Sequence, residues 1–195
     1  VEDSTMSLTI EEGHSWQNGD PVTAADVLTQ FKIASFRNEA RLISNPRIWE
    51  GFDSIQQTGE YTIEVELAGP YNEELVKLQT FIQTSAGAGA TLWTPEAVFG
   101  RFVESYADAT TDDERSSVRS DIIEFEWPWE EAYGNGPWKV DSIQEGQILL
   151  TPFEDHPLNE DLNFDNIRYR QIDNVVPALR SQELDYGFTE PETPL

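Results

Sequence analysis

Alternating apolar and polar positions predict the strands in the first half of this chain. Residues 6–10 alternate in this way, and residues 61–67 place four apolar side chains between threonine and glutamate. Such a period of two is typical of a strand with one buried face and one solvated face. Residues 52–57 precede the second run by a short turn at 58–60, and this arrangement predicts a β-hairpin.

The last third of the chain contains further predicted strands. Residues 139–143 and 147–152 flank Glu145 and Gly146, which predicts a second hairpin. Two further short strands are predicted, at 166–172 and at 184–188.

The helix that follows Thr23 carries the strongest local signals. Its apolar side chains recur with helical spacing and predict one packed face: Val27, Leu28, Phe31 and Ala34. Thr23 stands where an N-cap belongs, and Asp26, three residues later, completes a capping box. The preceding Asn-Gly-Asp-Pro at 18–21 predicts a tight turn, because Gly19 adopts a positive φ without strain.

Cap residues and apolar spacing predict four more helices, at 72–80, 95–106, 115–125 and 174–180. Thr94 is expected to cap the second of these, with Pro95 at its first position. Residues 108–114 are predicted to be a charged linker. The small residues at 84–91 lack the spacing of a phosphate-binding glycine loop.

The charge of the chain is strongly negative. Its 37 acidic and 12 basic residues give a net charge of −25, and only three of the basic residues are lysines. Self-repulsion of this size destabilises a compact chain in dilute buffer and keeps it soluble in concentrated salt, which favours a halophilic protein. The alternative is an ordinary acidic surface protein. Binding to nucleic acid or to an anionic membrane is disfavoured.

Several chemistries lack their residues. The chain has no cysteine, and its only histidines are His14 and His156. No Gly-x-Ser-x-Gly motif is present, so a nucleophilic site is not indicated. The acidic loop at 154–165 has neither the alternating oxygens nor the central glycine of a calcium loop. No apolar run approaches the length of a membrane-spanning helix.

Two aromatic and acidic features leave other functions open. Trp127-Pro128-Trp129 precedes two glutamates, a combination that suits a sugar platform, although two tryptophans packed on the surface are the commoner outcome. A pair of carboxylates for glycoside hydrolysis also remains open among 37 acids. An acidic carbohydrate-binding or glycan-active protein is therefore one rival interpretation. A structural domain of a cell-surface protein is the other.

The stretch at 8–31 resembles a segment of the family 5 extracellular solute-binding proteins, the peptide and nickel receptors of ABC importers. Their pattern places an aromatic residue, Asn or Asp, Gly, and then Thr-Ala-x-Asp-Val before an amphipathic helix. The matching residues are Trp16, Asn18, Gly19, Thr23, Ala24, Asp26 and Val27. Three later stretches are similar in the same order: 133–140, with Asn135 where Thr is usual, 149–174, and 176–187, with Gln182 in a glycine place.

The resemblance implies a periplasmic-binding-protein-like fold of type II, mixed α/β (α+β), with antiparallel strand pairs and flanking helices. Residues 1–195 are expected to be the central part of the first, larger lobe of a longer protein. Its N-terminal strand region and second lobe would then lie outside this chain. The region 84–129 matches least well, and the part near Asp108 is longer than in the family.

The resemblance also implies a function and ligand-side residues. The protein is expected to capture di- or oligopeptides, or a similar solute such as nickel, outside the cell and to deliver them to a membrane permease. It is expected to be a monomer anchored at the cell surface, and to have no cofactor, metal or catalytic residue. The expected ligand-side residues are Trp49, Asn135, Gly136 and Tyr186, with Arg37 for a ligand carboxylate. Each also has a structural interpretation, as a core aromatic or a turn residue.

Overall fold

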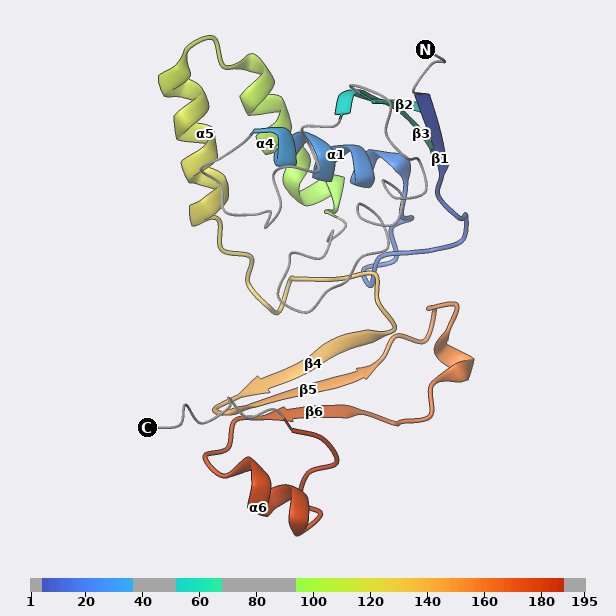
Figure 1. The fold of residues 1–195 in the computed structure, drawn as a ribbon, viewed down its shortest axis with the longest axis vertical. Coiled ribbons are helices and arrows are strands. Elements are labelled where there is room, and N and C mark those ends of the chain that lie inside the picture. Colours follow the sequence, from blue (N-terminus) through green and yellow to red (C-terminus); the bar gives the residue numbers. More distant parts are fainter. Residues whose placement is uncertain (1–4, 37–51, 68–93, 188–195) are drawn as a thin grey trace. The chain divides into compact units, whose positions relative to one another are not determined.

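The computed structural model describes residues 5–36, 52–67 and 94–187, which form two compact units, Val1–Ala132 and Tyr133–Leu195 (Figure 1). The predicted helix at 72–80 and the small-residue stretch at 84–91 lie outside the described residues. Within the described ranges each unit contains one three-stranded antiparallel sheet. The mixed α/β fold with antiparallel strand pairs is therefore confirmed.

The first sheet has the order β1-β3-β2, formed by β1 (Thr5–Thr9), β3 (Thr62–Leu67) and β2 (Phe52–Gly59). In this register Met6 lies opposite Val65, and Leu8 lies opposite Ile63. These side chains share one face, and Ile63 and Val65 are completely buried. The predicted strands and the 52–67 hairpin are confirmed.

The other face of the first sheet is polar. Ser54 donates a hydrogen bond to Glu66 at 3.1 Å, and Gln56 donates one to Glu64 at 2.8 Å. These cross-strand pairs satisfy the polar side chains without burying a charge. The predicted division into one buried face and one solvated face is thus present.

Helix α1 (Ala24–Ser35) has two buried sides, where the sequence pattern predicted one packed face. Ala24, Val27 and Phe31 form a core cluster with the buried face of the first sheet. Near its C-terminus, Ile33 and Phe36 belong to a second cluster with residues of α4 (Glu96–Asp108) and α5 (Asp112–Glu124). The first unit is therefore layered, with α1 between the sheet and the α4–α5 helix pair (Figure 1).

The Asp26 carboxylate links the first turns of α1 and α4. One oxygen accepts from the backbone N–H of Thr23 at 2.8 Å and closes the predicted capping box. The other accepts from the backbone N–H of Glu96 at 2.8 Å, although Glu96 is 70 residues away in sequence. Asp26 is 5% exposed, so both bonds form in a largely desolvated place.

Thr94 does not cap α4, so this sequence prediction is wrong. Pro95 occupies the N-cap position without a side-chain cap, and the Thr94 hydroxyl donates instead to the Gln30 side chain on α1. Because Asp26 supplies an oxygen to Glu96 N–H from the neighbouring helix, the first turn of α4 has an acceptor from outside its own sequence.

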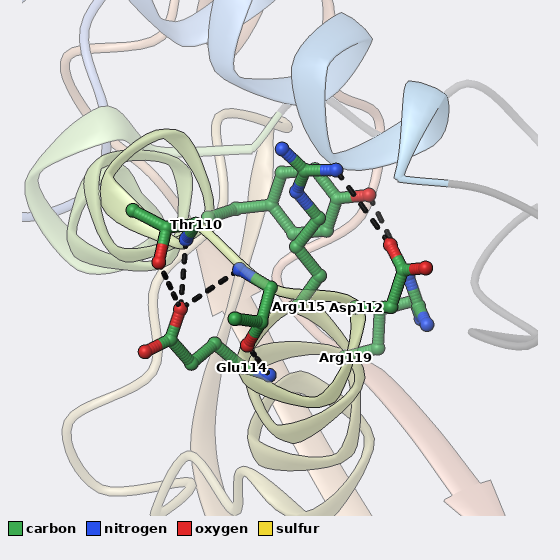
Figure 2. Close-up of polar contacts among 7 residues, drawn as sticks. Thr110, Asp112, Glu114, Arg115 and Arg119 are labelled. Atoms are coloured by element: carbon green, nitrogen blue, oxygen red, sulfur yellow. Dashed lines mark hydrogen bonds and ion pairs between the residues drawn. The ribbon is translucent and has the colours of Figure 1, made fainter.

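Helix α5 begins at Asp112, so the prediction of a charged linker over 108–114 is also wrong. Thr111 is the N-cap, and its hydroxyl accepts from Glu114 N–H at 3.2 Å. The Glu114 carboxylate accepts from the backbone N–H groups of Thr110 and Thr111 at 2.7 and 2.9 Å (Figure 2). This capping box draws the three acidic residues at 112–114 into the first turn, where the helix dipole favours negative charge.

The second sheet has the order β4-β5-β6, formed by β4 (Trp138–Gln144), β5 (Gln147–Pro152) and β6 (Ile167–Arg170). Gly146 turns the β4–β5 hairpin with φ +70°, as predicted. A short 3-10 helix, η2 (Asn159–Asp161), lies in the connection to β6. Helix α6 (Val175–Arg180) follows β6 and agrees with the predicted helix at 174–180.

The predicted closing strand at 184–188 is not observed in its described part, 184–187. After α6 the chain makes a helix C-cap, in which the N–H of Gln182 bonds Leu179 C=O and the N–H of Glu183 bonds Ala178 C=O. Gln182 adopts φ 58°, a left-handed conformation that explains why glycine suits this place in the family pattern. Apolar alternation alone does not make a strand, because a strand also needs a neighbour to pair with.

Candidate functional site

The five expected ligand-side residues divide into three groups. Arg37 and Trp49 lie outside the described residues. Asn135 and Gly136 lie in the bend that leads into β4. Tyr186 follows α6 and is 71% exposed.

The bend at 135–137 is held at one end of the second sheet. Pro137 C=O accepts from Phe153 N–H at 2.8 Å, directly beyond the pairing of Trp138 with Pro152. Asn135 and Gly136 are half-buried. A Cβ atom on Gly136 would meet no atom within 4 Å. The space on the Cβ side of Gly136 is therefore open.

The acidic loop at 154–165 begins at this same end of the sheet, because Phe153 joins it to β5. Its five carboxylates are exposed, which agrees with their interpretation as a solvated loop: Glu154, Asp155, Glu160, Asp161 and Asp165. His156 Nδ1 accepts from Leu158 N–H at 3.1 Å. The bend and the loop together offer backbone groups, an amide and carboxylates, which suit a polar or positively charged ligand group better than an anion.

Tyr186 is attached to the opposite end of the second sheet. Arg170, the last residue of β6, forms an ion pair with Glu183 at 3.0 Å, and Gln171 N–H bonds Gly146 C=O in the β4–β5 turn. The strands between the two ends measure about 20 Å, at about 3.3 Å per residue. The bend with Asn135 and Gly136 therefore lies at one end of the second sheet, and the segment that contains Tyr186 is joined to the other end.

The residues that carry the N-terminal motif serve the fold. Trp16 is buried, and its N–H and C=O bond Asp20 C=O and Gly19 N–H, each at 2.8 Å. Asn18 supports the same turn through its hydrogen bonds with Asp20.

Asp26 is the residue whose full role sequence reasoning missed. The capping-box pattern predicted its hydrogen bond to Thr23 but not its second hydrogen bond, to Glu96 at the start of α4.

The tryptophans at 127 and 129 do not share one environment. Trp127 packs edge-on against Phe99 of α4, with ring centroids 5.9 Å apart, and is half-buried. Trp129 is 38% exposed. This arrangement supports surface packing for Trp127 and does not support a two-ring sugar platform.

Two titratable groups in the first unit have shifted pKa values with local causes. Partial burial, followed by the charge of Glu60, raises the pKa of Tyr61. Hydrogen bonds from the backbone N–H groups of Thr110 and Thr111 lower the pKa of Glu114 from its ordinary value of 4.5. The Glu114 shift accompanies the hydrogen bonds that cap α5, and Tyr61 packs against the core cluster of the first sheet.

The described ranges show no cluster of metal ligands. Across 5–36, 52–67 and 94–187, no three His, Asp or Glu side chains gather closely enough to hold a metal ion. No helix in these ranges has both the length and the apolarity needed to cross a bilayer.

Comparison with known proteins identifies relatives of the whole chain. The family profile described as bacterial extracellular solute-binding proteins, family 5 Middle, matches residues 2–194. No curated protein sequence matches the chain.

Three solved structures illustrate the shared fold. The oligopeptide-binding protein AppA from Bacillus subtilis, in complex with a nonapeptide, has a TM-score of 0.63 at 15% identity over 94% of this chain. A mannohexaose-bound periplasmic oligopeptide-binding protein from Thermotoga maritima has a TM-score of 0.61 at 21% identity over 95%. NikZ from Campylobacter jejuni, in complex with Ni(L-His), has a TM-score of 0.59 at 16% identity over 95%. The matches cover only 32%, 30% and 32% of those three chains, so this chain spans about a third of their length.

Proposed function

The chain belongs to the family 5 extracellular solute-binding proteins, and from this premise we propose that it is part of the substrate-binding component of an ABC importer. The protein captures a peptide or similar solute outside the cell and delivers it to a membrane permease. The observation that carries the proposal is the family match over residues 2–194, supported by the fold shared with receptors that hold a peptide, a sugar or a nickel complex.

The 195 residues form the central part of the larger lobe in this proposal. The solute lies between two lobes that close by a hinge motion, and the closed monomer docks on the permease. Main-chain hydrogen bonds supply much of the affinity for a peptide. The ligand-side residues proposed on this chain are Asn135, Gly136, Tyr186, Trp49 and Arg37, and an added Cβ at Gly136 would meet no atom within 4 Å.

A thermal-shift screen tests the proposed function. The chain, extended to its natural termini and held in molar KCl, is mixed separately with peptide pools, oligosaccharides and nickel with histidine. A ligand at 100 times its Kd stabilises the folded state by about 2.7 kcal/mol. A shift with peptides alone supports a peptide receptor. No shift with any class, from a protein that melts cooperatively, would contradict a peptide receptor and favour another solute or the structural cell-surface domain.

Gly136 offers a sharp test of the ligand-side residues. In Gly136→Val the new Cβ would have no atom within 4 Å, and the substitution needs no change of φ, so folding should tolerate it. We expect solute affinity to fall at least about tenfold, because the added side chain blocks close approach of the ligand to the backbone. Gly59→Ala is the matched control, since its Cβ meets Thr62 only at ordinary contact distance. Unchanged affinity in Gly136→Val would remove this bend from the site.

The negative charge supports a halophilic protein. A net charge of −25 destabilises the folded chain by self-repulsion that salt screens. We expect the Tm to rise on the order of 10 °C between 0.1 M and 2 M KCl, measured by differential scanning calorimetry. A Tm that is independent of KCl would leave an ordinary acidic surface protein as the better interpretation.

A further inference from the structure

Two Asn-Gly dipeptides occur in this chain, Asn18-Gly19 and Asn135-Gly136, and no other asparagine in it precedes a glycine. An asparagine before glycine closes a five-membered succinimide ring more readily than one before any other residue, because glycine has no Cβ to hinder attack by its backbone nitrogen. The two dipeptides therefore have the same intrinsic chemistry. They differ in how the folded chain holds the asparagine side chain.

The Asn18 side chain is held by two hydrogen bonds. Its Nδ2 donates to Asp20 Oδ2 at 2.7 Å, and its Oδ1 accepts from Asp20 N–H at 3.1 Å. The second bond closes an Asx-turn, so the side chain has lost the freedom to bring Cγ onto the Gly19 nitrogen. The Asp20 carboxylate also opposes the negative charge that develops at the attacking nitrogen and at Cγ during ring closure. This site is therefore restrained against deamidation.

The Asn135 side chain lacks such a restraint within the described ranges. None of the residues described there donates a hydrogen bond to its amide group or accepts one from it. Asn135 is half-buried, whereas Asn18 is exposed. Solvent exposure alone would thus predict faster deamidation at Asn18, and side-chain freedom predicts the reverse order.

We propose that Asn135 is a site of spontaneous deamidation in the folded protein. The Gly136 backbone nitrogen loses its proton to hydroxide and forms a bond to Asn135 Cγ. The Cγ–Nδ2 bond then breaks, and ammonia leaves with a proton taken from water. A second water molecule hydrolyses the succinimide, adding OH to one of its two carbonyl carbons and H to the ring nitrogen. The product at position 135 is aspartate or isoaspartate, and water is the only co-reactant.

The modification alters the bend that leads into β4. Both products place a new carboxylate at the end of the second sheet where the acidic loop at 154–165 begins. Isoaspartate also adds a methylene group to the main chain directly before Gly136. Asn135 is a ligand-side residue of the proposed function, but the modification is detected without any solute, so the two proposals can fail separately.

Peptide mapping by mass spectrometry tests the proposal. The chain, extended to its natural termini, is incubated in mildly alkaline buffer with molar KCl, and in the same buffer with guanidinium chloride to unfold it. The mass gain on replacement of NH₂ by OH is followed at Asn18 and Asn135. We expect folding to slow the reaction of Asn18 at least about tenfold more than that of Asn135, which corresponds to about 1.4 kcal/mol of activation free energy.

Two results of this measurement would overturn the proposal. One is an equal or stronger slowing at Asn135 on folding, which would mean that the fold protects this residue. The other is an Asn135 that stays unmodified in the folded chain while the unfolded chain is converted.

Two substitutions change the two sites in opposite directions. Gly136→Ala adds a Cβ that meets no atom within 4 Å, at a residue without positive φ, so folding should tolerate it. It hinders attack by the backbone nitrogen and should slow deamidation of Asn135 at least about tenfold, with Asn18 unchanged. Asp20→Ala removes the acceptor of Asn18 Nδ2 and should accelerate deamidation of Asn18. An unchanged rate at Asn135 in Gly136→Ala would exclude ring closure, and an unchanged rate at Asn18 in Asp20→Ala would exclude control by the side-chain hydrogen bonds.

Discussion

The two sheets of the described residues each have three strands, but they differ in how far their apolar side chains are buried. In the first, the central strand β3 buries Ile63 and Val65 under α1, and the other face is polar and solvated. In the second, the central strand β5 carries Ile148 and Leu150 on a face that no described layer buries. The described residues of the first unit thus bury an apolar sheet face, whereas those of the second unit leave Ile148 37% exposed.

The strongest test of this difference compares the same substitution on the two central strands. Ile63→Ala should cost about 2–5 kcal/mol of unfolding free energy, because it leaves a cavity in a closed core. Ile148→Ala in the 195-residue chain should cost less than about 1 kcal/mol, because that side chain is already 37% exposed. Urea unfolding in molar KCl measures both. Equal losses of unfolding free energy in Ile63→Ala and Ile148→Ala would contradict the difference between the two sheets.

The carboxylate that joins α1 to α4 gives the next largest expected effect. Asp26→Ala leaves the backbone N–H groups of Thr23 and Glu96 without this acceptor and should cost about 2–4 kcal/mol. Asp26→Asn retains one carbonyl oxygen and should lose less. Asp113→Ala, an exposed acidic position in the first turn of α5, is the control and should change stability by less than about 0.5 kcal/mol. Equal stability of Asp26→Ala and Asp113→Ala would mean that the Asp26 hydrogen bonds to Thr23 and Glu96 do not contribute to the free energy of unfolding.

A smaller change of opposite sign is expected in the second unit. Gln182→Gly should stabilise α6 by about 1 kcal/mol, because Gln182 holds φ 58° and glycine adopts this conformation without strain. Hydrogen exchange of the amides at 175–180 measures the gain. Asp185→Gly serves as control, since its φ is not positive, and it should give no gain. Faster exchange in Gln182→Gly would contradict the assignment of strain to this residue.

The smallest effect concerns the cap of α5 and depends on pH. The pKa of Glu114 is lowered in the folded state, so its stabilising contribution is present above the ordinary value of 4.5 and is lost as pH falls through the folded value. We expect the stability difference between the wild type and Glu114→Gln to be largest near pH 7 and to vanish towards pH 3. Amide exchange of Thr110 and Thr111 reports it. A difference that persists at pH 3 would mean that charge is not responsible.

Local sequence signals predicted most of the individual elements. The capping box at Thr23, the turn at Gly19 and both hairpins are present, because each depends on residues close together in the chain. The start of α5 was also readable, since Thr111 and Glu114 have the spacing of a capping box, and the prediction overlooked this pair. The ordered motifs along the chain were sufficient to identify the family.

Contacts between distant residues were decided only by the tertiary structure. The bond between Asp26 and Glu96 spans 70 residues, and neither sequence segment specifies the other. The predicted strand at 184–188 had suitable alternation, yet its described part follows the cap of α6, because pairing depends on which neighbour is available.

In β3 the sequence by itself determined which side chains share a face, because apolar and polar residues alternate strictly along the strand. In β4 the tertiary structure decided it, because a register shift between Val140 and Ser142 places Ile143 on the same face as Val140. The tertiary structure also decided that the apolar face of the first sheet is buried, because α1, which packs on it, comes from a separate segment of the chain.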